Sequence, residues 1–144
     1  MLVKLLTNQI IEWWPIFDSH INATVPGDDP MKMLNIKTAL LKGDMDLWIL
    51  QGNESKQLVP YGIVLTTTTT DVCVNVRSLL LYCVYGYKLV EATQWLLGWE
   101  TLKAHAKAMG CSRIVAYSSV DRIVEVAREL GMDTSQRYLT YEVA

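Results

Sequence analysis

The chain has 144 residues, of which 51% are hydrophobic and 19% charged, and its formal net charge is −2. A chain of this length buries roughly 70% of the surface that it exposes when unfolded, so it needs no disulfide or metal to hold it together. The composition excludes a disordered chain, and the slightly acidic balance argues against broad contact with nucleic acid or an anionic membrane. We therefore expect a single domain over residues 1–144.

The cysteines and histidines exclude two kinds of site. Cys73, Cys83 and Cys111 form no C-x-x-C pair and leave one thiol over from any disulfide count. The apolar start of the chain is too short for a signal peptide or a membrane span, so we expect reduced thiols in a cytoplasmic protein. With His20 and His105 as the two histidines, no metal cluster is expected.

The first part of the chain is predicted to contain two helices between two short strands. Apolar residues three and four apart indicate a helix over residues 8–23, which Pro15 should kink or restart. A second helix is indicated by Pro30 at its start and Gly43 just past its end. The strands are expected at residues 2–6 and 47–50.

Two long strands, residues 59–70 and 72–84, are predicted to meet near Asp71. The first ends in five threonines, which favour a strand but offer no apolar alternation, so this stretch is expected to be exposed or at a sheet edge. In the second, the apolar alternation changes parity near Arg77 and Ser78. Such a slip is typical of a β-bulge, and a strand buried on both faces is the alternative.

The second half of the chain alternates helices and strands. A long helix is predicted over residues 89–109, with a core stripe that includes Leu96, Trp99 and Leu102. It is followed by a strand at residues 113–117, a helix at 120–130 and a last strand at 136–143. The order β-α-α-β-β-β-α-β-α-β indicates an α/β protein with a central mixed sheet and helices on both faces.

Four segments occur in an order and spacing that resemble a known family. They are residues 40–49, 58–64, 104–111 and 123–132, the last ending in Leu-Gly-Met. Together they resemble the GNAT superfamily of acyl-CoA N-acyltransferases over nearly the whole chain. The resemblance implies the GNAT fold, with a bulge in the fourth strand whose backbone N–H meets the acyl carbonyl. In such a site Leu81, Cys83, Gly86 and Lys88 would contact acetyl-CoA.

Two features that the family uses for chemistry are missing. The family holds the cofactor pyrophosphate with a glycine-rich segment before the third helix, whereas residues 90–95 contain no glycine and include Glu91. Gly86 and Lys88 lie nearby and leave open a displaced, weaker cradle. The tyrosine with which many members reprotonate the CoA thiolate is replaced by Ala127.

Other side chains that could supply chemistry have simpler structural explanations. A general base would have to be Asp46, Glu54 or Asp71, and acids in turns are usually solvated. Cys83 with His105 would give a nucleophile and its base, but a cysteine in an apolar strand is usually a small core residue. No catalytic residue is therefore assigned.

Trp13, Trp14 and Trp95 are the candidates for an interface, because tryptophan suits surfaces that are half apolar and half wet; the alternative is a place in the core. We expect a catalytically silent GNAT-like protein without cofactor that acts through contacts with a protein partner or with further copies of itself. A resemblance to GNAT-like proteins encoded among phage structural genes implies a role in the virion or its assembly. The alternatives are an active acetyl-CoA-dependent N-acetyltransferase with a divergent phosphate loop and a CoA-binding module without turnover.

Overall fold

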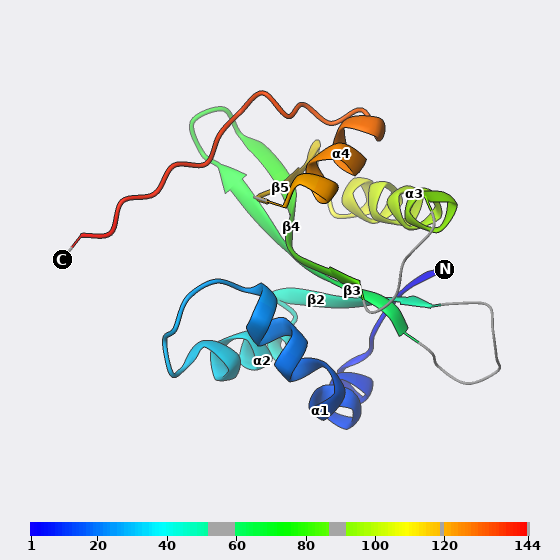
Figure 1. The fold of residues 1–144 in the computed structure, drawn as a ribbon, viewed down its shortest axis with the longest axis vertical. Coiled ribbons are helices and arrows are strands. Elements are labelled where there is room, and N and C mark those ends of the chain that lie inside the picture. The colour runs from blue at the N-terminus through cyan, green and yellow to red at the C-terminus, as the bar shows by residue number, and fades with distance from the viewer. Residues whose placement is uncertain (52–59, 87–91, 119, 144) are drawn as a thin grey trace.

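The computed structural model describes residues 1–51, 60–86, 92–118 and 120–143. Figure 1 shows a sheet with α1 and α2 on one face and α3 and α4 on the other. The expected mixed α/β architecture is therefore confirmed. The elements are β1 (Leu2–Lys4), α1 (Thr7–Thr24), α2 (Lys32–Lys42), β2 (Met45–Gln51), β3 (Pro60–Asp71), β4 (Val76–Gly86), α3 (Ala92–Ala108), β5 (Arg113–Ala116) and α4 (Asp121–Glu129).

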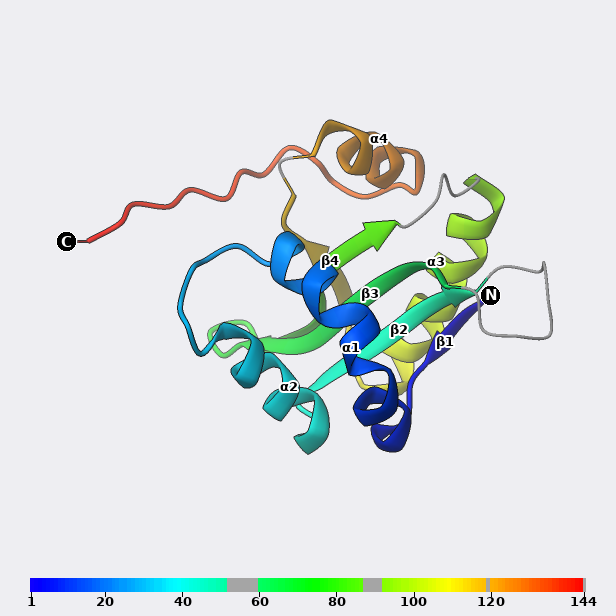
Figure 2. The same ribbon diagram turned by 60° about the horizontal axis from the view of Figure 1, so that its bottom comes forward.

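The five strands lie in the order β1-β2-β3-β4-β5. Neighbouring strands from β1 to β4 are antiparallel, whereas β4 and β5 are parallel and are joined through α3. Figure 2 shows α1 and α2 in front of the sheet and α3 behind it. The helix between β4 and β5 is the crossover that a parallel pair requires.

Alternating side chains of the strands build a separate apolar core on each face. In β2, for example, Leu47 and Ile49 point toward α1 and α2, and Trp48 and Leu50 point toward α3. The core under α1 and α2 contains Ile10, Phe17, Ile21, Ile36, Leu40, Leu47, Ile49, Ile63, Leu65 and Cys83. The core under α3 contains Leu2, Trp48, Leu50, Val64, Leu79, Leu102 and Ala106.

The first two helices differ from the sequence prediction in two respects: Pro15 does not interrupt α1, and α2 begins at Lys32 instead of Pro30. α1 continues through Pro15 as one helix, so the predicted restart at this residue is wrong. Phe17 and Ile21 are fully buried beyond the proline, and their packing offsets the hydrogen bond that proline cannot donate. α2 ends at Gly43 as predicted, with the glycine in the left-handed conformation at φ 82°.

The run of five threonines is only partly exposed. Thr66 is completely buried, and its hydroxyl accepts a hydrogen bond of 3.0 Å from the indole nitrogen of Trp48, which satisfies the buried oxygen. β3 is an inner strand of the sheet, and its pairing with β2 extends to Thr67, which lies opposite Met45. The edge position expected for the threonines is therefore wrong for Thr66 and Thr67. Thr69 and Thr70 are exposed, as expected, on the part of the β3–β4 hairpin that extends past β2.

The inner face of α3 is rotated relative to the predicted stripe. Leu102 is buried as expected, but Leu96 is half exposed and Trp99 is only partly buried. The helix instead approaches the sheet through Gly98, where an added Cβ would lie 3.7 Å from Leu2 and 3.8 Å from Leu50. Both distances are ordinary van der Waals separations, so a methyl group would fit at this position.

The last predicted strand is not formed. Residues 132–143 follow α4 without helix or strand, and Figure 1 shows this segment extending away from the rest of the molecule. The described chain therefore has nine elements instead of the ten expected. The start of the predicted strand 72–84 is also wrong, because residues 72–75 form the turn of the hairpin and β4 begins at Val76.

Candidate functional site: the opening between β4 and β5

β4 and β5 diverge halfway along the sheet. They pair from Ser78 and Arg113 to Leu81 and Ala116, and the pairing ends there. β4 continues to Gly86, paired with β3 on its other side. Beyond Leu81, β4 therefore has no paired strand on this side among the described residues, and we call this region the β4–β5 opening (residues 82–86 and 117–118).

A β-bulge lies where the opening begins. Leu65 pairs with Cys83 and Thr66 with Leu81, so Tyr82 is an extra residue in β4. The prediction of a bulge in this strand is correct, but its position near Arg77 and Ser78 is wrong, because both residues pair regularly with β3. The sequence obscured the position because Leu79, Leu80 and Cys83 make the strand apolar on both faces.

The candidate cofactor contacts fall at different depths around this opening. Leu81 is partly buried against the α3 core, and Gly86 is exposed at the end of β4. The Cys83 thiol is buried in the α1–α2 core next to Thr24, and this burial raises its pKa to about 11. A thiol with this pKa is protonated at neutral pH and is a poor nucleophile. Lys88 lies outside the described residues.

The other candidates for chemistry lie away from the opening. The suggested Cys83–His105 pair is wrong, because Cys83 lies in the α1–α2 core and His105 packs against Trp48 on the opposite face of the sheet. Asp46 lies 3.5 Å from the Nε2 atom of His105, on the α3 face. Asp71 is exposed at the β3–β4 turn, as expected for a turn carboxylate, and Glu54 lies outside the described residues.

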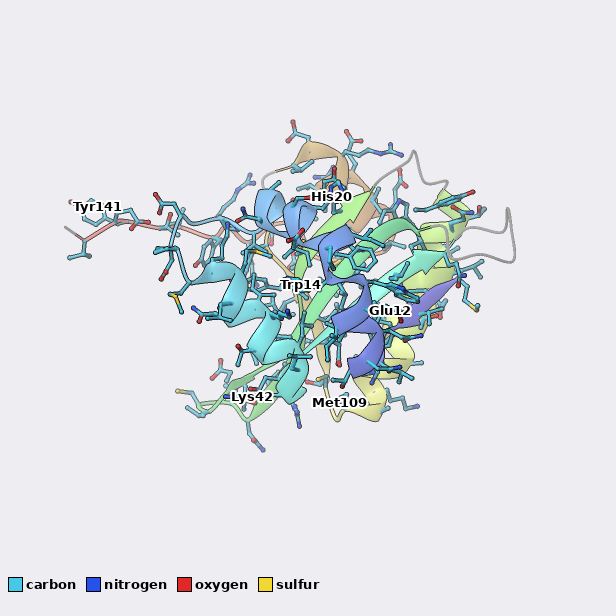
Figure 3. All side chains as sticks on the ribbon, turned by 90° about the horizontal axis from the view of Figure 1, so that it is seen from below. Glu12, Trp14, His20, Lys42, Met109 and Tyr141 are labelled. Carbon is cyan, nitrogen blue, oxygen red and sulfur yellow. The ribbon has the colours of Figure 1, made fainter. Side chains whose placement is uncertain are left out.

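Sequence reasoning missed one pair of side chains at the opening. The rings of His20 on α1 and Tyr85 on β4 are 4.7 Å apart, tilted by 43°. Tyr85 lies three residues past the bulge, and Figure 3 shows His20 on the part of α1 that crosses this strand. The contact depends on how α1 crosses β4, and no sequence pattern indicates such a crossing.

The sequence matches no family model, and no curated protein is significantly similar to it. The structure, in contrast, is similar to solved acetyltransferases along its whole length. A probable acetyltransferase has a TM-score of 0.72 at 14% identity, covering 100% of this chain and 97% of that chain. The ribosomal-protein-alanine N-acetyltransferase of Brucella melitensis has a TM-score of 0.67 at 13% identity, with coverage of 100% and 99%. The glucosamine-6-phosphate N-acetyltransferase of Arabidopsis thaliana has a TM-score of 0.64 at 15% identity, with coverage of 100% and 98%.

The chain has the GNAT fold. This confirms the fold that the sequence resemblance implied, and at these identities the likeness extends to the fold alone. One solved neighbour, AAC(6')-Iy, is in complex with a bisubstrate analogue that contains CoA. Whether the residues of this chain suit such a cofactor has to be judged from its own structure.

The described residues can be compared with the two ends of an acyl-CoA. The bulge at Tyr82 leaves a backbone position out of the regular ladder at the start of the opening, which suits an acyl carbonyl. The first turn of α3 carries Thr93 and Trp95 instead of glycine, and Trp95 packs toward the α3 core. A pyrophosphate needs close approach to the backbone at a helix start, and residues 87–91 before this helix lie outside the described residues. Ala127, half-buried on α4, cannot protonate a thiolate.

The three candidate interface tryptophans are partly buried. Trp13 and Trp14 pack against the α1–α2 core, and Trp95 packs against the α3 core. The ammonium group of Lys37 lies over the Trp14 ring, 5.8 Å from its centroid. Figure 3 shows Trp14 between α1 and α2. Their role as interface residues stays a prediction.

Within residues 1–51, 60–86, 92–118 and 120–143, no helix is long and apolar enough to cross a lipid bilayer. The same part of the chain contains no group of three or more metal-ligating side chains.

Proposed function

We propose that this chain uses the GNAT fold as a scaffold for contacts with other protein chains and does not catalyse acyl transfer. The observation that carries the proposal is the exposed apolar segment after α4. Tyr138, Leu139, Tyr141 and Val143 are 69–90% exposed, although large apolar side chains are normally covered. Such a segment suits a protein that completes its surface by binding another chain.

The first turn of α3 and the position of Ala127 support the absence of catalysis. Thr93 and Trp95 stand where the family places glycines, and an alanine stands where many members place the acid. A structural or assembly role among phage proteins is the setting that the sequence resemblance implies, and we include it in the proposal.

A transfer assay tests the catalytic part of this proposal. The protein is incubated with acetyl-CoA and one of three amines, namely a peptide with an N-terminal alanine, glucosamine 6-phosphate or an aminoglycoside, and acetylated product is measured by mass spectrometry. These acceptors follow the names of the solved neighbours. We expect no product above the uncatalysed background. Product that increases with protein concentration would contradict the proposal.

The second candidate function is acyl transfer from acetyl-CoA, which the bulge at Tyr82 and the neighbouring His20–Tyr85 pair favour. An imidazole near the acyl position is a suitable general base. If the assay does give product, His20→Ala should lower the rate of product formation by about 10²-fold or more, which is the usual contribution of a general base. His105→Ala is the matched control, because His105 lies on the opposite face of the sheet.

A further inference from the structure

A second hollow lies at the other end of β5 from the β4–β5 opening. The second half of α3, the turn before β5 and the chain just after α4 line a groove of about 350 Å³ that is open to solvent. We call it the α3–β5 groove, and Trp99, Lys103, Lys107 and Arg113 are among its lining residues. β5 runs from Arg113, at this groove, to Ala116, where its pairing with β4 ends at the opening. The length of β5 therefore separates the two sites.

Three cations line the α3–β5 groove, although the whole chain has a net charge of −2. The side chains of Lys103, Lys107 and Arg113 are exposed, and no acidic side chain lines the groove in the part of the chain that the structure describes. Lys107 and Arg113 form no ion pair with any described residue. Lys103 pairs with Glu100 at 2.7 Å, but both side chains are largely exposed, and an exposed pair of this kind contributes little. The positive charge of the groove is therefore available to a ligand.

The floor of the groove is apolar. Ala106 is buried in the α3 core, and Cys111 and Ile114 pack against the same core. Trp99, which the sequence places in the core stripe of α3, is only partly buried and lines the groove. A half-covered tryptophan is typical of the residues that contribute most to protein interfaces. An apolar floor with a cationic rim fits a ligand that carries both carboxylates and an apolar side chain.

The spacing of side chains along α3 suits an extended peptide segment. Trp99, Lys103 and Lys107 follow one another at intervals of four residues, which is about 6 Å along a helix axis. In an extended chain, side chains on one side belong to every second residue and are about 6.7 Å apart. A segment with one apolar and two acidic residues at alternate positions therefore matches this row.

Other classes of ligand fit the groove less well. A site for a small molecule encloses most of its ligand, whereas this groove is open to solvent. Nucleic acid is bound through a broad basic surface, and this chain is slightly acidic as a whole. An acidic protein segment needs neither an enclosed pocket nor a broad basic surface.

We propose that the α3–β5 groove binds an extended acidic segment of another protein, with two carboxylates on Lys103 and Lys107 and an apolar side chain on Trp99. Arg113, on β5, can hold a further carboxylate through two N–H groups. Complementary charge selects an acidic segment over a neutral one. The inference rests on the proposed function and deepens it, because it names the chemistry of the partner in the protein contacts.

Fluorescence anisotropy of labelled peptides with the full chain tests this inference. The matched peptide, Gly-Leu-Ser-Glu-Ser-Glu-Gly, carries leucine and two glutamates at alternate positions. The rearranged peptide, Gly-Leu-Ser-Ser-Glu-Glu-Gly, has the same composition, and a third peptide has glutamine in place of both glutamates. We expect the matched peptide to bind with a dissociation constant below about 1 mM, the rearranged peptide to bind about threefold more weakly or worse, and the glutamine peptide not to bind detectably.

Charge variants locate the binding on the chain. Lys103→Gln/Lys107→Gln should weaken binding of the matched peptide by about fivefold or more, with an unchanged unfolding midpoint because both side chains are exposed. Lys37→Gln/Lys42→Gln is the matched control, since it removes the same charge from α2 on the other face of the sheet (Figure 1), and it should leave binding unchanged. Absence of saturable binding, equal binding of the rearranged peptide, or equal binding by Lys103→Gln/Lys107→Gln would overturn the proposal.

Two further measurements separate this proposal from its alternatives. A labelled single-stranded RNA that binds more tightly than the matched peptide, and loses affinity in Lys103→Gln/Lys107→Gln, would assign the groove to nucleic acid and overturn the proposal. The acetyl-CoA transfer assay reports on the proposed function separately, because the groove and the β4–β5 opening lie at opposite ends of β5. Acetylated product would contradict that function whether or not the peptide binds, and failure of the peptide to bind would leave the absence of catalysis standing.

Discussion

At the scale of single residues, one buried hydrogen bond explains why Thr66 differs from its neighbours in the threonine run. The Trp48 indole donates to the Thr66 hydroxyl at 3.0 Å inside the core. Thr66→Val keeps the shape but leaves the indole N–H without an acceptor, so we expect the free energy of unfolding to fall by about 1–3 kcal/mol. Thr69→Val, at an exposed position of the same strand, should change it by less than about 0.5 kcal/mol. Equal effects in denaturant unfolding would show that the bond contributes little.

His105 is the second residue with a measurable consequence. Burial lowers its pKa from the ordinary value of 6.5; the Asp46 carboxylate opposes this effect and the charge of Lys4 adds to it. Desolvation is the largest of these effects, so the folded state favours the neutral ring. Below about pH 6.5 the unfolded chain therefore binds a proton that the folded chain excludes, and stability falls until the pH reaches the lowered pKa of the folded state.

The predicted loss of stability on acidification is tested by measuring the free energy of unfolding at neutral pH and near pH 5.5, because histidine ordinarily titrates between these two values. We expect the wild-type chain to lose more stability over this interval than His105→Gln, which cannot take up the proton. If the stability of His105→Gln depends on pH in the same way as that of the wild type, groups other than His105 cause the dependence.

At the scale of elements, two glycines have opposite predicted responses to alanine. At Gly98 in α3, the new Cβ would make ordinary contacts of 3.7–3.8 Å with Leu2 and Leu50. Because alanine favours a helix over glycine, we expect Gly98→Ala to raise the free energy of unfolding by about 0.5–1 kcal/mol. At Gly62 in β3, the Cβ would lie 2.8 Å from the backbone oxygen of Tyr85, and we expect a loss of about 1–3 kcal/mol. Urea unfolding measures both, and a loss of stability in Gly98→Ala would contradict the packing described for α3.

The elements also show which features the sequence could predict. The C-terminal end of α2 and the types and order of the first nine elements followed from glycine and apolar spacing, because these signals are local. The rotation of α3, the bulge at Tyr82 and the His20–Tyr85 contact depend on which residues meet across the sheet. The strand predicted at residues 136–143 has the right pattern but finds no partner within its own chain. Periodicity indicates a face that can pair and does not indicate what it pairs with.

At the scale of the whole molecule, the structure has the GNAT scaffold, and we propose that its centre is altered. The sheet, the divergence of β4 and β5 and the bulge at Tyr82 are those of the GNAT fold. The first turn of α3 and the Ala127 position lack the groups that the family uses on its cofactor. The exposed segment after α4 adds a surface for another chain. These features support our proposal that the scaffold serves contacts with other chains.

Calorimetric titration with acetyl-CoA at neutral pH is the most direct test of this account, with an active acetyltransferase of the same fold as the positive control. The account predicts that no binding is detected with a dissociation constant near 10 μM or tighter, which corresponds to about −7 kcal/mol. Binding at or below that constant would show that the first turn of α3 still holds the cofactor, and would contradict the central claim.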